Sequence, residues 1–417
     1  MKRWHTASVK LLIMMLMVSL MVTGCSLLPT TVADSIQNAQ EGGDGSTVTI
    51  SREEYDRLQK YAEMDELVQV VEAYYYQEPN VDAMIENAER GLLYGLEDPY
   101  TYYYSPEEYA ALWESDEGQY AGIGIQLTGS METYLCTIMR VFTGSPAEAA
   151  GLLKGDTLVK VEDLEVTTYS MQEAVDIMRG QVGDKVKVQV KRGNELLDFE
   201  IPRAVIHVNW VSSLMLDNDI GYIVLYEFSG DCAPAFQKQL DELMAKGAKG
   251  LIIDLRDNPG GWVDDAVQLA DIFLPEGTVA YLEKRDGSRE YYTAKAGEIN
   301  IPLVVLINEN SASASEILSG ALQDYHKATL VGTKSFGKGV VQYVLPVGTK
   351  GAGMQLTIAQ YFTPNGNVVH KTGITPDVEV PMPEGQSSIT FDLGDLSDAQ
   401  LQKAYEVARQ LVAEKAK

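Results

Sequence analysis

The residues best suited to chemistry lie in two short turns, SASASE at residues 311–316 and SFGKGVVQ at residues 335–342. The first follows an apolar run and precedes a helical pattern, which predicts a strand-to-helix junction where backbone N–H groups carry positive partial charge. Lys338 lies in a glycine-rich loop that can approach other backbone closely. Gln342 lies on the same face as Lys338 if this segment is a strand, and could orient the lysine by hydrogen bonding. The turns thus offer a hydroxyl, an amine and an orienting amide.

Both turns also have a simpler interpretation. Ser313 and Glu316 form an S-x-x-E capping box, and capping of the helix alone would explain both residues. Residues 332–338, GTKSFGK, satisfy most of a phosphate-binding loop, but Gly339 stands where the magnesium-binding Ser or Thr belongs and a strand follows, which excludes a nucleotide site. A Ser–His–Asp triad has no local support, because the histidines lie elsewhere, at His5, His207, His326 and His370.

Residues 206 to about 380 alternate apolar runs with helical stretches, the pattern of an α/β fold. A turn with the sequence Asp-Asn-Pro-Gly-Gly, residues 257–261, follows one of the apolar runs directly. The pattern predicts strands over residues 221–228, 250–256 and 301–310, and helices over residues 234–247, 263–274 and 317–326.

A compact β-rich module is expected over residues 119–205. Its order of glycine-rich loop, SPAEAAGL, GD-x-L-V-K-V and AV-x-x-x-R-G resembles a PDZ domain, although an isolated G-x-G alone would indicate only a tight turn. In that family, backbone N–H groups of the loop form a nest for a peptide's C-terminal carboxylate, and the peptide adds as an extra strand. The loop residues here are Gly122, Ile123, Gly124 and Ile125.

The N-terminus has the pattern of an export signal. A basic start is followed by the apolar run 11–22, which is shorter than the roughly 20 residues that span a bilayer. The following Val-Thr-Gly-Cys resembles the lipobox of bacterial lipoproteins, which implies removal of residues 1–24 and lipidation of Cys25. The protein would then be anchored to the bacterial cell membrane on its extracytoplasmic side. An ordinary secretory signal or an uncleaved anchor is the alternative, and residues 25–50 are expected to form a flexible tether.

Composition narrows the choice of partners. The 60 acidic residues outnumber the 33 Lys and Arg and leave a formal net charge of -27, so a nucleic acid would be repelled. Cys136 and Cys232 are expected to be buried free thiols, with a bridge between them as the alternative in an oxidising compartment.

Two further regions have a helical pattern, residues 51–118 and the tail 384–417. The first is dense in tyrosines, which could form a ligand cage, but we expect them to fill the seams between short helices: Tyr74–Tyr76, Tyr100 and Tyr102–Tyr104.

Taken together, SASASEI, SFGKGVVQ, D-L-R-x-N-P-G-G and LTIAQYFTPNGNVVHKTGITPDV resemble the carboxy-terminal processing peptidases, a serine endopeptidase family with a PDZ domain. The resemblance covers roughly residues 65–380. It implies an α/β fold in which a ClpP/crotonase-like protease core, residues 206–383, is combined with an inserted PDZ domain and an N-terminal helical region. Matched position by position, Ser313 is the nucleophile, Lys338 the general base and Gln342 the residue that positions the lysine.

The same resemblance assigns supporting roles. The backbone amides of Ala314 and of Gly260 (or Gly261) would form the oxyanion hole. Arg179 would contact the protease when peptide is bound, although a solvated arginine at a helix end is the alternative. Because a neighbouring negative charge would keep the Lys338 ammonium protonated, we expect no carboxylate to contact Lys338 in the active form.

The resemblance implies an endopeptidase that cleaves extracytoplasmic proteins near their C-termini, with the PDZ domain capturing the free C-terminus and gating activity. It implies no metal and no cofactor. The terminal helical regions pair subunits in relatives, so a homodimer is possible, with an ordinary packed tail helix as the alternative. Three other functions account for the residues less well: a binding module on an inactive core, an acyl-CoA enzyme of the same fold, and a structural envelope lipoprotein.

Overall fold

The computed structural model describes residues 48–116, 118–384, 386–388 and 391–417. The described residues form two compact units, one with residues 48–106 together with 345–354, and one within residues 107–344 and 355–417. The predicted signal segment, Cys25 and nearly all of the predicted tether lie outside the described residues. No helix in the described part of the chain is both long and apolar enough to cross a membrane.

The first unit is helical, as its sequence pattern predicts. Ser51 and Asn80 cap two of its helices by accepting backbone N–H groups in the first turn. The tyrosine prediction is wrong for Tyr74 and Tyr76, whose side chains are 83% and 82% exposed. The elements are α3 (Arg52–Leu58), η1 (Gln59–Tyr61), α4 (Ala62–Tyr74), α5 (Val81–Tyr94) and β1 (Tyr102–Tyr104).

The β-rich module of the second unit is built on a six-stranded antiparallel sheet in the order β3-β4-β5-β7-β8, with β6 beside β5. The chain enters and leaves the module side by side, because β2 (Gln119–Gly122) pairs with β9 (Ala204–His207). The other elements are β3 (Ile125–Gly129), β4 (Cys136–Val141), α7 (Pro146–Ala150), β5 (Thr157–Val161), β6 (Leu164–Glu165), η2 (Thr168–Ser170), α8 (Met171–Met178), β7 (Lys185–Arg192) and β8 (Glu195–Pro202).

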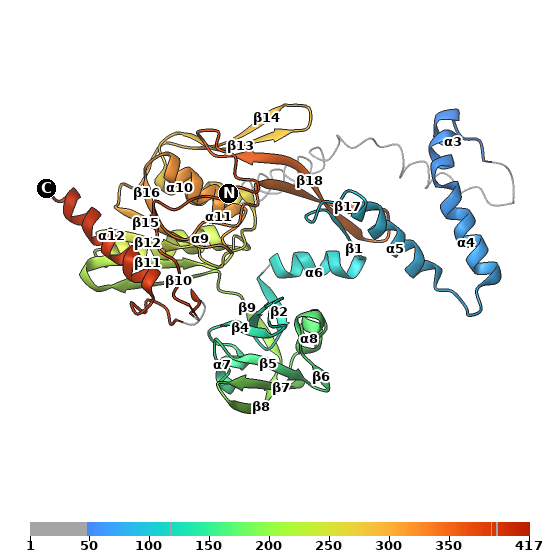
Figure 1. Cartoon of the computed structure of the whole chain (residues 1–417), viewed down its shortest axis with the longest axis horizontal. Helices are drawn as coiled ribbons and strands as arrows, with labels where there is room; N and C mark the ends of the chain where they lie inside the picture. Colours follow the sequence, from blue (N-terminus) through green and yellow to red (C-terminus); the bar gives the residue numbers. More distant parts are fainter. Residues whose placement is uncertain (1–47, 117, 385, 389–390) are drawn as a thin grey trace, which may run out of the picture. The chain divides into compact units, whose positions relative to one another are not determined.

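The core of the second unit is a six-stranded sheet in the order β10-β11-β12-β15-β16-β19 (Figure 1). All neighbours are parallel except β10 and β11, and parallel strands need cover on both faces. Three helices, α9 (Cys232–Ala245), α10 (Val263–Phe273) and α11 (Ala314–Asp324), cover one face. The strands are β10 (Val211–Leu216), β11 (Ile220–Leu225), β12 (Gly250–Asp254), β15 (Leu303–Ile307), β16 (Ala328–Gly332) and β19 (Val378–Glu379).

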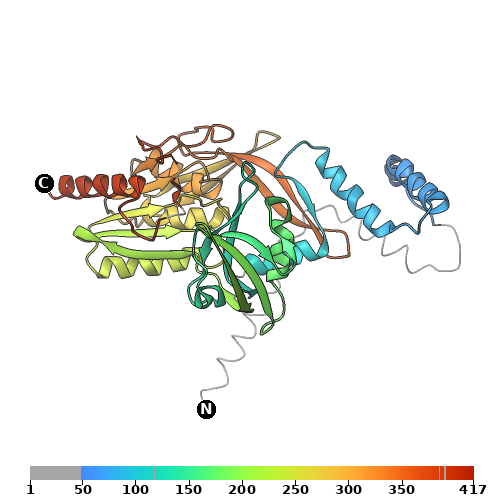
Figure 2. The ribbon, with the colours of Figure 1, turned by 60° about the horizontal axis from the view of Figure 1, so that its bottom comes forward.

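The predicted tail contains helix α12 (Ala399–Lys415), which covers the other face of this sheet (Figure 2). Leu401, Ala404 and Ala408 are buried against a group of strand residues that includes Ile252 and Val304. The structure therefore favours the packed-helix alternative for α12 within one chain.

A second sheet runs in the order β14-β13-β18, with β17 beside β18. Helix α6 (Pro106–Asp116) precedes the β-rich module. The two cysteines of the described chain, Cys136 and Cys232, are buried and free, as expected from the sequence. The strands of this sheet are β13 (Gly277–Lys284), β14 (Arg289–Ala294), β17 (Val340–Val347) and β18 (Ala352–Phe362).

Arg256 ties helix α12 to the end of β12. Its side chain is buried and forms ion pairs with Asp254 at 2.7 Å and with Asp398 at 2.6 Å. Asp398 is also the N-cap of α12, where it accepts the backbone N–H groups of Gln400 and Leu401. The turn at residues 257–261 follows Arg256 directly, so the C-terminal helix stabilises the base of that turn.

The substitution Asp398→Ala removes both the cap and one partner of a buried charge. Breaking a buried pair costs about 3–5 kcal/mol, so we expect the free energy of unfolding to fall by about that amount. Urea denaturation of the purified protein measures it. The control is Glu406→Ala on the same helix, which removes a pair with Lys403 that is exposed on both sides and is expected to change stability by about 0–1 kcal/mol. Equal effects of the two substitutions would contradict this account.

Candidate active site

Three turns that carry the predicted site residues meet at one edge of the core sheet. Strands β12, β15 and β16 are adjacent and parallel, so their carboxyl ends lie at the same edge. The Asp-Asn-Pro-Gly-Gly turn follows β12, the serine turn follows β15, and the Lys338 loop follows β16. The topology alone therefore brings the three turns together.

Ser313 lies at the N-cap of α11 with a φ of 54°, a left-handed conformation that is uncommon for residues other than glycine. Its two neighbouring serines have structural roles: the Ser311 hydroxyl donates to the Leu255 carbonyl at 2.7 Å, and the Ser315 hydroxyl donates to the Asn258 carbonyl at 3.0 Å. Both are fully buried, whereas Ser313 lines a cavity. The geometry therefore singles out the middle serine of the three.

The Glu316 side chain joins the serine turn to the Lys338 loop. Its Oε2 atom accepts the backbone N–H of Ser313 and that of Lys338, both at 2.9 Å. Its Oε1 atom accepts the backbone N–H of Gly337 at 2.7 Å and the hydroxyl of Ser335 at 2.5 Å. One carboxylate thus fixes the Ser313 turn and the Lys338 loop relative to each other.

Glu316 is fully buried, and burial raises its pKa from the ordinary value of 4.5. The hydrogen bonds from Ser335 and from the backbone act in the opposite direction. The expectation that no carboxylate contacts Lys338 is wrong for its main chain, because the Glu316 carboxylate accepts the Lys338 backbone N–H. From sequence, Glu316 was visible only as a helix cap, and its donors at residues 335–338 lie too far along the chain to be recognised.

Lys338 and Gln342 line the same cavity as Ser313. Gln342 lies in β17 and donates from Nε2 to the Thr357 hydroxyl of β18 at 3.2 Å. This bond orients the amide that we predict to position Lys338.

The glycine turn packs directly against Ser313. A Cβ atom on Gly260 would lie 2.7 Å from the Ser313 Cβ, so no other residue fits there. However, Gly260 donates its N–H to the Asn258 side chain at 2.9 Å. Gly261 lines the cavity, while Ala314 is the first residue of α11, where helical N–H groups have no partner within the helix. The geometry favours Gly261 over Gly260 as the glycine of the predicted oxyanion hole.

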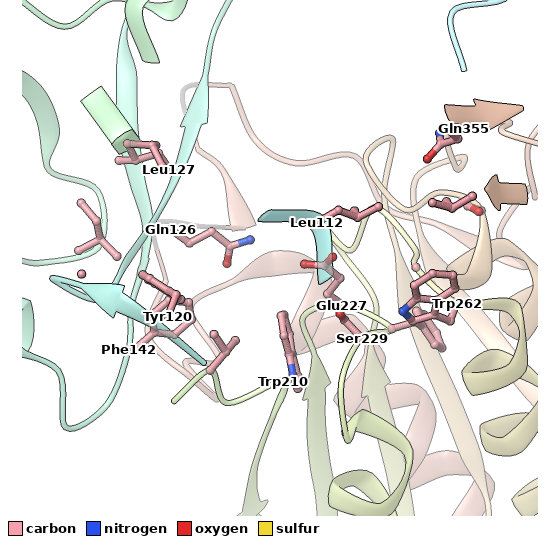
Figure 3. A pocket seen from close by; sticks show the side chains of 18 of the residues that line it. Leu112, Tyr120, Gln126, Leu127, Phe142, Trp210, Glu227, Ser229, Trp262 and Gln355 are labelled. Atoms are coloured by element: carbon pink, nitrogen blue, oxygen red, sulfur yellow. The ribbon is translucent and has the colours of Figure 1, made fainter. Parts of the chain in front are cut away.

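One cavity of about 470 Å³ connects these residues to the β-rich module. Figure 3 shows its walls: Leu127, Tyr120 and Phe142 come from the module, and Trp210 and Trp262 from the core. Aromatic and aliphatic side chains dominate both walls. The sequence-predicted residues that line it are Gly122, Ile123, Gly124, Ile125, Arg179, Gly261, Ser313, Lys338 and Gln342.

The loop that is predicted to bind a carboxylate, residues 122–125, is fixed by backbone hydrogen bonds and by close packing. Gly124 has a φ of 88°, and a Cβ atom there would lie 2.3 Å from the Ser145 Cβ, so glycine is required. The Gly124 carbonyl accepts the backbone N–H of Phe142 at 3.0 Å, and the Ile123 carbonyl accepts that of Ala147 at 2.9 Å. These bonds fix the loop that we predict to bind a carboxylate.

Arg179 ends helix α8 beside this loop. Its guanidinium lies 5.1 Å from the centre of the Tyr120 ring. Burial raises the pKa of Tyr120 to about 12, with Arg179 acting against that rise. Tyr120 therefore stays neutral, and the arginine adds positive charge near the loop.

Comparison with known proteins gives one consistent result. Residues 219–380 match the family model of peptidase family S41, and residues 121–202 match that of the PDZ domain. A carboxy-terminal-processing protease of Bartonella bacilliformis is 36% identical over 82% of this chain and 80% of its own length. The carboxy-terminal processing protease CtpA of Bacillus subtilis is 35% identical over 78% and 70%. The solved structure of a photosystem II D1 C-terminal processing protease matches with 28% identity and a TM-score of 0.55 over 80% of this chain and 94% of that one.

The Glu316→Gln substitution tests the joining role of this carboxylate. Glutamine keeps one acceptor oxygen but turns an NH₂ group toward N–H donors. Hydrogen bonds to charged groups contribute about 1.5–3 kcal/mol each, and a tenfold rate change is about 1.4 kcal/mol, so we expect turnover to fall by roughly 10²-fold or more. Steady-state kinetics measure it.

The control is Glu309→Gln, an exposed glutamate that accepts the Thr333 hydroxyl beside the same loop. It should keep near-normal turnover. Wild-type turnover in Glu316→Gln, at unchanged melting temperature, would show that the carboxylate does not determine how the Ser313 turn and the Lys338 loop are placed.

Proposed function

Because the chain belongs to the carboxy-terminal processing proteases of peptidase family S41, we propose that it cleaves peptide bonds with Ser313 as nucleophile and Lys338 as general base. Membership of this family makes it a serine peptidase. The observation that carries the residue assignment is the Glu316 carboxylate, which holds the Ser313 turn and the Lys338 loop at the wall of one cavity.

The proposed reaction begins when the Ser313 hydroxyl oxygen attacks the scissile carbonyl carbon and Lys338 Nζ accepts the hydroxyl proton. The N–H groups of Gly261 and Ala314 stabilise the resulting oxyanion, and such a donor is worth about 2.7–4 kcal/mol of barrier. Lys338 then protonates the leaving amine, and water attacks the acyl-enzyme to release the second product and restore the serine. Lysine has a free pKa of about 10.4, so the site must favour its neutral form, and Gln342 orients its amine.

The PDZ domain captures the free C-terminus of a protein substrate in this proposal. Strand β3 lies at the edge of its sheet, which leaves one side open for an added peptide strand. Residues of β3 and of α8, among them Leu127, Val175 and Met178, line the cavity between them with apolar groups. These features support recognition of an apolar C-terminal segment, with its carboxylate at the Gly122, Ile123, Gly124 and Ile125 loop. Arg179 contributes to gating.

The lipid anchor is a proposal that rests on sequence. Cys25 follows a short apolar run and small residues, the pattern of a lipoprotein signal. A lipid on Cys25 would hold the enzyme at the bacterial cell membrane, facing extracytoplasmic substrates. Loss of membrane association in Cys25→Ser tests this anchor.

A homodimer through the N-terminal helices is supported by their exposed apolar side chains. Helices α3 to α5 bury no residue within one chain. Several of their large apolar residues are 49% to 67% exposed, which is unusual in a stable monomer. These residues are Leu58, Leu67, Val70 and Leu92. The molecular mass of the soluble protein in solution tests this pairing.

The proposed mechanism is tested with soluble protein that begins at Ser26. Wild-type protein should cleave an unstructured protein with an apolar C-terminus, as followed by mass spectrometry of the fragments. Ser313→Ala removes the nucleophile, and Lys338→Arg keeps the charge but cannot lose its proton, so both should be inactive. Lys334→Arg, at an exposed lysine in the same loop, is the matched control and should remain active.

Cleavage by Ser313→Ala would show a wrong nucleophile. Normal turnover by Lys338→Arg would show a wrong base.

A further inference from the structure

A buried arginine joins the PDZ domain to the protease core. Arg140 lies in β4, opposite Gln126 of β3, and is only 9% exposed. Its Nη2 atom donates to the backbone carbonyl of Asn209. Its guanidinium lies 4.8 Å from the centre of the Phe142 ring and 3.6 Å from that of the Tyr226 ring. The cation is therefore in contact with one aromatic ring from each domain.

Arg140 lacks the partner that a buried arginine normally has. Among the described residues it forms no ion pair with a carboxylate, and its buried Nη1 atom has no hydrogen-bond partner. Arg256, by contrast, is buried against two carboxylates. Burial lowers the pKa of Arg140 to about 10, which leaves it charged at neutral pH. A buried charge without a counter-charge costs several kcal/mol, so stability alone does not account for arginine here.

On the PDZ side, Arg140 contacts Phe142, a residue that is bonded to the carboxylate loop. The Phe142 ring that contacts its guanidinium also lines the cavity, and the Phe142 backbone N–H donates to the Gly124 carbonyl at 3.0 Å. A negative charge bound at the loop would therefore act on this cation across a poorly solvated region.

On the protease side, the Tyr226 segment holds the glycine turn. Two residues after Tyr226, the Phe228 backbone N–H donates to the Gly260 carbonyl at 2.8 Å. The Phe228 carbonyl accepts the N–H of Trp262, also at 2.8 Å, and a Cβ atom on Gly261 would lie 2.0 Å from that carbonyl oxygen. A shift of this segment must therefore move Gly261, which carries a proposed oxyanion donor.

We propose that Arg140 is a positioning residue that couples capture of a peptide carboxylate by the PDZ loop to the placement of Gly261, acting through Tyr226. The inference rests on the proposed function, and it names a residue besides Arg179 through which that gating passes. A peptide carboxylate at the loop would supply a negative charge, for which the described side chains offer Arg140 no carboxylate partner. It therefore favours the packed arrangement of Phe142, Arg140 and Tyr226, and a ligand shifts an equilibrium only through such a difference in interaction.

The test separates peptide capture from its effect on catalysis. A short internally quenched peptide, blocked at both ends, reports hydrolysis at Ser313, and a second peptide with an apolar free C-terminus is added as activator. In wild-type protein we expect the activator to accelerate hydrolysis with saturation. In Arg140→Met the maximal acceleration should fall at least about fivefold toward none. Binding of the labelled activator to Arg140→Met in a Ser313→Ala background, followed by fluorescence anisotropy, should change less than about threefold in Kd.

Tyr226→Leu provides a second variant, because it removes the same contact from the protease side and leaves the PDZ domain unchanged. It should also abolish acceleration, and the double variant with Arg140→Met should lose no more than either single variant. Arg409→Met is the matched control. It removes a contact of the same kind, with Tyr405 on α12, and should keep full acceleration.

Three results would overturn the proposal. Full acceleration in both Arg140→Met and Tyr226→Leu would show that the coupling does not pass through this contact. Loss of activator binding in Arg140→Met would place the residue in capture instead. Basal hydrolysis by wild-type protein without any acceleration would remove the gating on which the coupling depends, whereas absence of hydrolysis in wild-type protein would show failure of the proposed function itself.

Discussion

The arrangement of the site depends on one buried carboxylate that joins two turns from different strands. Glu316 accepts hydrogen bonds from Ser313 in its own turn and from Ser335, Gly337 and Lys338 in the next loop. Burying a carboxylate is destabilising unless its oxygen atoms accept hydrogen bonds. The oxygens of Glu316 have all of these donors only when both turns are in place. The same requirement therefore stabilises the active geometry and excludes alternatives in which the lysine loop lies elsewhere.

The rest of the fold places these turns next to Glu316. Parallel strands β12, β15 and β16 end at one edge of the sheet, and the segments that follow them carry Gly261, Ser313 and Lys338. Glycine at position 260 lets the first turn touch Ser313. Helix α12 covers the other face of the sheet, and the bond between Arg256 and Asp398 joins its N-terminus to the base of that turn. Residues of the PDZ domain line the same cavity as Ser313 and Lys338, so the proposed substrate capture and the proposed catalysis would share one space.

Sequence alone was sufficient for features that depend on local pattern. The α/β alternation, the PDZ module and the serine, lysine and glutamine motifs each follow from residues close together in the chain. It was insufficient where a role depends on distant partners. The sequence predicts Glu316 only as a helix cap, because its other donors lie at residues 335–338. The contact of Arg140 with Tyr226 could not be predicted, because the two residues are far apart in the sequence. Likewise, the tail pattern predicted a helix but not that α12 covers the core sheet.

The proposed mechanism requires that the fold presents Ser313 to a lysine that is neutral near physiological pH. The most direct measurement is the pH dependence of the rate at which a fluorophosphonate modifies the protein, with the modified residue identified by mass spectrometry. The account predicts modification of Ser313, a rate that rises with a single ionisation well below the free lysine pKa of about 10.4, and loss of that ionisation in Lys338→Met. Modification of another residue, or an unchanged pH profile in Lys338→Met, would contradict it.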